Sequence, residues 1–217
     1  LYGPLFLLIG SLLNLIGQNN INLLISLFKI TLLGVNIINS LLIFKLTNSK
    51  RALFLYSCNP LIIFELAGNT HLDSLLILFL LISLLILNKQ PIMGYLSIVA
   101  SILIKYFTLS LIPFFTIFIF RKSIKSFIIA LFLSVILIII VFVPFWSGPD
   151  IFNYLTSYYD ESSPFPSLGI LLGSVILGSY ELSFNINTII FLSIFLLFAI
   201  KLIRIENNLA KLISLSM

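Results

Sequence analysis

Four polar side chains that could do chemistry lie close together in the chain: Glu65, Asn69, His71 and Asp73. A carboxylate or an imidazole can exchange a proton with a substrate, and an amide can hydrogen-bond a substrate hydroxyl. The first, second and fourth of these residues are spaced by four. They would share one face of a helix if that helix continued through Gly68. The cluster is therefore the first candidate for a functional site.

A structural explanation of the same residues stays open. Glu65 could pair with Lys105 or with a backbone group, and residues 69–73 could form a solvated turn with Asp73 as the N-cap of the next helix. Lys105 itself lies in an apolar run. Its ammonium needs a counter-charge, from a protein carboxylate or a phosphate-bearing ligand, or else it snorkels to the membrane interface. Residue spacing alone does not separate these roles.

The segments that must position these residues are apolar. The chain of 217 residues is 60% hydrophobic and only 9% charged, whereas a soluble domain carries roughly a quarter of its residues as charged side chains. Too few polar residues exist to cover a compact fold in water. Long runs of Leu, Ile and Phe without alternation favour helices over a membrane barrel. We therefore expect an all-α, polytopic bundle of transmembrane helices that forms a single domain over residues 1–217.

The lengths of the apolar runs predict short helix pairs within this bundle. Residues 52–66 and 92–105 would each form a helix of roughly 20 Å, shorter than the roughly 30 Å hydrocarbon core. We expect re-entrant-like hairpins whose tips, at 68–73 and around Lys105, stop inside the outer leaflet, where polar backbone must line a cavity or be buried in protein. Asn59-Pro60 breaks the run 52–66, and Lys105 and Pro113 interrupt the longer apolar stretch 92–120. The other expected segments are 5–16 (re-entrant or interfacial), 21–46, 74–87, 127–145, 167–179 and 186–203.

The distribution of charge predicts the orientation. Of the twelve cations only Lys29 and Lys105 lie away from one set of loops, and five of the seven acidic residues lie at the opposite ends: Asp73, Asp150, Asp160, Glu161 and Glu181. The positive-inside rule makes the basic loops cytoplasmic. Residues 68–73 and the loop 146–166 then face the other side. The cations that set the orientation are Lys45, Lys50, Arg51, Lys89, Arg121, Lys122, Lys125, Lys201, Arg204 and Lys211.

The loop 146–166 contributes Asp150, Asp160 and Glu161 among Pro and Tyr residues. Aromatic and carboxylate side chains bind sugars, and they also populate ordinary membrane interfaces. The sequence has no Gly-rich phosphate loop, no HExxH and no Cys/His set with metal-ligand spacing. The net charge of +5 is not gathered in a basic cluster interleaved with aromatics, so nucleic acid is not expected as a partner.

Several short motifs resemble those of one enzyme group. Asn59-Pro60-Leu61 is followed by 65–73, which reads Glu-Leu-Ala-Gly-Asn-Thr-His-Leu-Asp. These motifs resemble the polytopic GT-C glycosyltransferases, especially bacterial polyprenyl-phosphomannose-dependent mannosyltransferases and, more distantly, GPI mannosyltransferases. Thr70 departs from the Gly usual there. Further matches are Tyr2-Gly3-Pro4-Leu5, then Gly94, Lys105 and Pro113, and finally Pro-Phe-Trp-x-Gly-x-Asp at 144–150.

The resemblance implies a multi-pass membrane enzyme of the bacterial or archaeal plasma membrane rather than the ER. Such an enzyme moves a hexose, here mannose, from a polyprenyl-phosphate-sugar donor to a lipid or glycan acceptor on the non-cytoplasmic face, among membrane lipids. The resemblance implies supporting catalytic roles for Asp73 and His71. It implies substrate binding by Glu65, Asn69, Lys105, Tyr2 and Asp150.

In this group the main catalytic acid lies in a first outer loop that precedes the Tyr-x-Pro-Leu segment. We therefore expect the sequence to be truncated at its N-terminus, with the first transmembrane helix, that loop and its acid upstream of Leu1. A divalent metal, magnesium or manganese, would be bound through the same loop.

A transporter or flippase for a lipid-linked or polar substrate is the alternative, because transporters also bind substrates at broken helices with polar tips. Against it, no internal repeat relates the two halves of the sequence.

Overall fold

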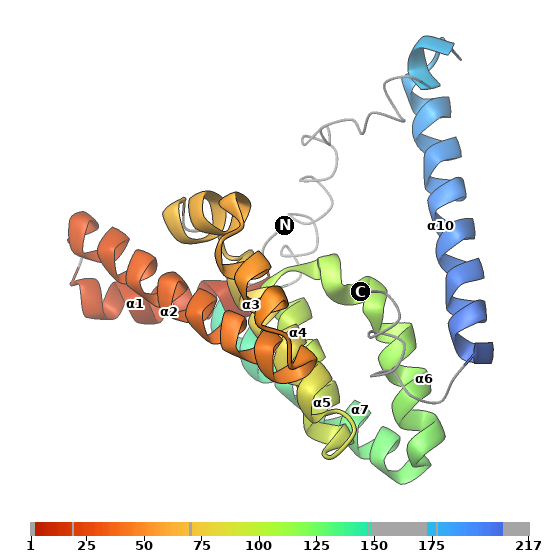
Figure 1. The fold of residues 1–217 in the computed structure, drawn as a ribbon, viewed down its shortest axis with the longest axis horizontal. Helices are drawn as coiled ribbons and strands as arrows, with labels where there is room; N and C mark the ends of the chain where they lie inside the picture. The colour runs from red at the N-terminus through yellow and green to blue at the C-terminus, as the bar shows by residue number, and fades with distance from the viewer. Residues whose placement is uncertain are drawn as a thin grey trace. The chain divides into compact units, whose positions relative to one another are not determined.

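The computed structural model describes residues 3–18, 20–69, 71–146, 148, 173–176 and 178–205. These residues are mostly helical and contain no β-strand, as the sequence predicts (Figure 1). They divide into two compact units, one within 3–144 and one within 145–205. The first unit carries all of the described candidate site residues.

The first unit opens with two helices joined by a tight turn. α1 (Pro4–Gly17) begins at a proline in its first turn, where the missing N–H is not needed. α2 (Ile21–Thr47) begins at Asn20, whose side-chain oxygen accepts a hydrogen bond from the backbone N–H of Leu23 at 3.2 Å. Both helices match the segments expected at 5–16 and 21–46.

The next segment is broken, as Asn59-Pro60 predicts. α3 (Lys50–Ser57) is followed by the π-helix η1 (Ile62–Gly68). The wide turn of η1 ends where the backbone N–H of Asn69 donates to the Phe64 carbonyl at 2.8 Å. No helix continues through Gly68. The single face proposed for Glu65, Asn69 and Asp73 therefore does not form.

Two short antiparallel helices follow, α4 (Asp73–Ile86) and α5 (Pro91–Ile104), each of 14 residues. They pack side by side (Figure 1). Three serine hydroxyls donate across the pair to backbone carbonyls: Ser83 to Gly94 at 2.6 Å, Ser97 to Phe79 at 2.7 Å and Ser101 to Leu76 at 3.0 Å. Small residues let the two backbones approach closely.

The chain after α5 is interrupted at Lys105 and Pro113, as predicted. The 3₁₀ segment η2 (Tyr106–Leu111) leads into α6 (Ile112–Lys122), which has Pro113 in its first turn. α7 (Ile124–Phe142) then begins at Ser123 and runs into η3 (Val143–Phe145).

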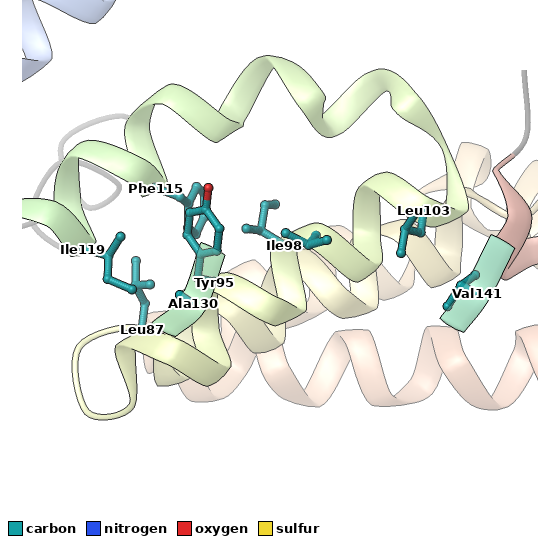
Figure 2. Close-up of a cluster of buried hydrophobic side chains, with 9 residues drawn as sticks. Leu87, Tyr95, Ile98, Leu103, Phe115, Ile119, Ala130 and Val141 are labelled. Carbon is teal, nitrogen blue, oxygen red and sulfur yellow. The ribbon is translucent and has the colours of Figure 1, made fainter. Parts of the chain in front are cut away.

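Two clusters of buried side chains hold this unit together. One cluster joins α5, α6 and α7 through residues such as Tyr95, Ile98 and Phe115 (Figure 2). The second lies at the other end of α5 and consists of Leu32, Val35, Leu72, Leu75, Leu76 and Ile104. The second cluster lies directly beneath the candidate site, because Leu72 and Ile104 each neighbour a candidate residue in the chain.

Two described helices are long and apolar enough to cross a membrane, α2 and the segment Ile124–Phe145. Large apolar side chains are exposed along both, for example Ile37 and Phe132. α1, α4 and α5 are apolar but shorter. In the second unit α10 (Tyr180–Ile205) contains the segment expected at 186–203. Most of the segment expected at 167–179 and most of the loop 146–166 lie outside the described residues, although residues 173–176 are helical.

Candidate active site

Asp73 and Lys105 form an ion pair. The Lys105 Nζ donates to the Asp73 Oδ1 at 2.6 Å, and the side chains are 33% and 34% exposed. Asp73 is the first residue of α4, and Lys105 is the residue directly after α5. The structure thus joins the two tips that the sequence singles out. It also shows that a protein carboxylate supplies the counter-charge that Lys105 requires.

The packing of α4 against α5 brings these residues together. The serine contacts at 83–94, 79–97 and 76–101 set an antiparallel register in which steps of three or four residues along one helix match steps of three or four along the other. Asp73 and Lys105 occupy the next position of that ladder. The carboxylate lies at a helix N-terminus and the ammonium at a helix C-terminus, so both charges suit the helix dipoles.

The N-terminus of α4 is held by polar side chains of α2 and α3. The Asn39 Nδ2 donates to the carbonyl of Ser74 at 2.9 Å, and the Tyr56 hydroxyl donates to the Asn36 Oδ1 at 3.1 Å. Asn39 is fully buried, and the Tyr56 oxygen lies 3.3 Å from its Nδ2. Because Ser74 adjoins Asp73, this network holds the backbone that carries the carboxylate.

Asn36, Asn39 and Tyr56 are not among the site residues predicted from the sequence. Two asparagines spaced by three in an otherwise apolar span would place costly amides on one helix face, which is a detectable signal. In the described part of the chain three atoms of this network have no hydrogen-bond partner: the Asn36 Nδ2, the Asn39 Oδ1 and the Ser74 Oγ.

Two of the remaining candidates, Asn69 and His71, are exposed on the segment between η1 and α4, directly before Asp73.

The N-cap of α4 is Leu72, and Asp73 is the first helical residue, so the expectation that Asp73 caps this helix is wrong. Backbone turns at Leu72 take the place of a side-chain cap, with the Leu75 N–H donating to the Leu72 carbonyl at 3.0 Å.

Other candidates cannot be placed at the site. Glu65 lies in η1, but its side chain is outside the described residues, as are Tyr2 and Asp150. Among the described residues, no three Asp, Glu, His or Cys side chains gather in a group that could hold a metal ion.

Comparison with known families gives one match. Residues 1–121 match the MptA_B family, described as alpha-(1->6)-mannopyranosyltransferase, N-terminal domain. The match covers more than half of the 217 residues. The chain belongs to the MptA_B family. It is thus a member of a mannosyltransferase family, and the predicted glycosyltransferase class is confirmed. Comparisons with curated proteins and with solved structures found no match.

The MptA_B match includes the whole ion-pair region. It covers α1 to α5, η2 and nearly all of α6, and therefore both Asp73 and Lys105 together with the asparagine network of α2. α7 and α10 lie beyond it. The part of the chain that the family defines is thus the part that builds the candidate site.

Proposed function

We propose that the chain is a single membrane module of a multi-pass GT-C mannosyltransferase. It transfers mannose from a polyprenyl-phosphate-linked donor to a lipid or glycan acceptor on the non-cytoplasmic face, forming an α-(1→6) linkage. The observation that carries the proposal is the Asp73–Lys105 pair, which lies at the end of two short apolar helices within the part matched by a mannosyltransferase family.

The reaction needs a cation beside the donor phosphate. Transfer breaks the bond between the anomeric carbon and a phosphate oxygen and forms a glycosidic bond to the acceptor oxygen, whose proton passes to a base. Negative charge grows on the departing phosphate, and a fixed ammonium stabilises it. We assign this role to Lys105. Asp73 orients the ammonium, and Asn69 and His71 hydrogen-bond the sugar or support the proton transfer.

The position of the pair suits a lipid-linked substrate. At about 1.5 Å per residue, α4 and α5 are each about 21 Å long, less than the roughly 30 Å hydrocarbon core. Their opposite end carries Lys89 and, beside it, the Asn88 carbonyl that accepts a hydrogen bond from Lys122. If those cations face the cytoplasm, Asp73 and Lys105 lie at membrane depth toward the other face, where a polyprenyl phosphate enters.

Substitution of Lys105 tests the proposal. Membranes containing the full-length protein should transfer radiolabelled mannose from a polyprenyl-phosphate donor. Lys105→Met should reduce this transfer by about 100-fold, as loss of one charge-stabilising donor does in other enzymes. Lys105→Arg should keep part of the activity, because it retains the charge but changes the donor geometry. Normal transfer by a Lys105→Met protein that accumulates to the usual level would refute the role of Lys105.

A further inference from the structure

The backbone beside Lys105 is held by the segment that precedes α1. Lys105 has an extended conformation, with φ −153° and ψ 127°, so α5 stops at Ile104. In a continuing helix the Ile104 carbonyl would accept a hydrogen bond from the N–H four residues later. That partner is lost at the break, while Ile104 itself is fully buried. A buried carbonyl in this position needs another donor.

Gly3 supplies the donor. Its backbone N–H donates to the Ile104 carbonyl at 2.8 Å. Residues 3 and 104 are far apart in the sequence, so this bond is a tertiary contact between the start of α1 and the end of α5. It satisfies the buried Ile104 carbonyl, which has no helical donor because Lys105 is extended. The bond thereby stabilises the break at which Lys105 leaves the helix.

Space at this contact excludes any side chain. A Cβ at position 3 would lie 2.6 Å from the Leu103 carbonyl carbon and closer still to its oxygen. These are backbone atoms of α5, so they cannot move aside without displacing the end of the helix. Gly3 has φ −86° and ψ 171°, which any residue can adopt. The glycine is therefore required by the close approach and not by its backbone angles.

The contact is anchored from the α1 side. Gly3 and Pro4 are buried, and Phe6 and Ile9 pack against the cluster that contains Leu72 and Ile104. A displacement at position 3 is thus opposed by packing on one side and by the α5 backbone on the other. The half-buried Lys105 directly follows Ile104, so a shift of the α5 end would move it.

We propose that Gly3 is a positioning residue for mannosyl transfer. Its N–H and its lack of a side chain hold the end of α5 in the shape that brings the Lys105 ammonium to Asp73. The proposal rests on the proposed function, because the activity that Gly3 serves is the Lys105-dependent one. It concerns a residue that does not itself touch the substrate.

The main test is Gly3→Ala in the full-length protein, with Gly10→Ala, in the helix α1 that follows Gly3, as the matched control. A Cβ at Gly10 would meet only the Phe28 ring, at an ordinary 3.6 Å. Gly3→Ala should lower mannose transfer at least 10-fold, and Gly10→Ala should not change it. Combined with Lys105→Met, Gly3→Ala should cause no further loss, because it acts through Lys105. Additive losses would overturn the proposal.

A second measurement does not depend on activity. In a Cys58→Ser background, Lys105→Cys carries the one thiol of the 217-residue chain, and its labelling rate with a charged thiol reagent reports the local conformation. Gly3→Ala should change this rate several-fold, whereas Gly10→Ala should leave it unchanged. An unchanged rate would overturn the positioning role. A changed rate with a fully active Lys105→Met protein would retain that role and reject the proposed function.

A milder variant covers the case in which Gly3→Ala does not accumulate. Replacing Gly3 by glycolic acid through nonsense suppression turns its amide into an ester, which deletes the N–H and adds no atom that could clash. Transfer should fall several-fold, and the labelling rate at position 105 should shift in the same direction as in Gly3→Ala. Wild-type values of both quantities would overturn the proposal.

Discussion

The two ends of the α4–α5 pair are built differently. At the end where the helices connect, Gly94 packs directly on the backbone of Leu87, and the Ser83 hydroxyl bridges to the Gly94 carbonyl at 2.6 Å within an apolar cluster. At the other end an ion pair is one-third exposed, and it is supported by the Asn39 side chain of α2 and by the Gly3 N–H just before α1. Close apolar packing stabilises the fold, whereas a partly exposed pair of charged side chains is available to bind a ligand.

This contrast explains why substitutions at the two ends should have separable effects. A change at the connecting end alters packing that every folded molecule needs, so it should lower stability and leave the activity of folded molecules unchanged. A change at the ion-pair end alters charge rather than packing, so it should lower activity far more than it lowers stability. The largest expected difference between the two ends is the side of the membrane from which each can be labelled.

The two ends should be accessible from opposite sides of the membrane. In a Cys58→Ser background, Lys89→Cys at the connecting end should react with an impermeant thiol reagent only from the cytoplasmic side. His71→Cys at the ion-pair end should react only from the other side. Both residues are exposed, and the excess of cations near Lys89 sets the direction. The measurement is labelling of sealed vesicles of known orientation. Labelling of both positions from one side would break the comparison.

The next largest effect is expected at Asp73. Asp73→Asn keeps the size of the side chain but removes the charge that holds Lys105 at 2.6 Å. Mannose transfer should fall by about 100-fold, as removal of one catalytic acid–base or orienting group does. Because both partners are one-third exposed, the ammonium left unpaired can turn toward water or the membrane interface, so the apparent Tm should fall only modestly while transfer is nearly lost. The measurements are the initial rate of transfer in membranes and thermal unfolding of the purified protein.

His71→Gln is the companion variant for Asp73→Asn. It keeps hydrogen-bonding capacity but removes the imidazole that could exchange a proton. Full activity in both variants would reject the site assignment, and a loss of activity that follows a loss of stability in both would reject the contrast between the two ends.

The sequence predicts the breaks of the fold better than its contacts. Asn59-Pro60, Lys105 and Pro113 interrupt apolar runs, and the helices end close to them. Such signals are local, because proline lacks an N–H and a buried charge opposes a continuing apolar helix. The expected shared face of Glu65, Asn69 and Asp73 is wrong, because it requires one regular helix, whereas the π-helix η1 ends at Gly68 and α4 begins only at Asp73.

The pairing of Asp73 with Lys105 needed the register of two helices. Gly94, Ser97, Ser101 and Lys105 recur at steps of three or four residues, which marks a small-residue face of α5 that the sequence shows. That face alone does not say which helix it meets or at what offset. The serine hydrogen bonds to α4 decide both. The support from Asn39 and Gly3 is likewise tertiary: both residues stand out in the sequence, but the groups that they contact, the Ser74 and Ile104 carbonyls, do not follow from it.

The smallest effect should appear at the connecting end, in Gly94→Ala. A Cβ there would lie 2.7 Å from the Leu87 Cα and 2.9 Å from its Cδ1, so the two helices must separate slightly. Overpacking of this kind costs about 1–3 kcal/mol, and for a chain of this size the apparent Tm falls by about 2–4 °C per kcal/mol. The transfer rate per folded molecule should stay at the wild-type value, because the ion pair lies at the far end of both helices.

Gly34→Ala in α2 is the control for Gly94→Ala, since a Cβ there meets nothing within 4 Å. This control should leave Tm unchanged or raise it slightly. Thermal unfolding and transfer assays on the same preparations separate the two quantities. A Gly94→Ala protein that kept its Tm but lost transfer would show that the connecting end also shapes the site, and the contrast between the ends would not hold.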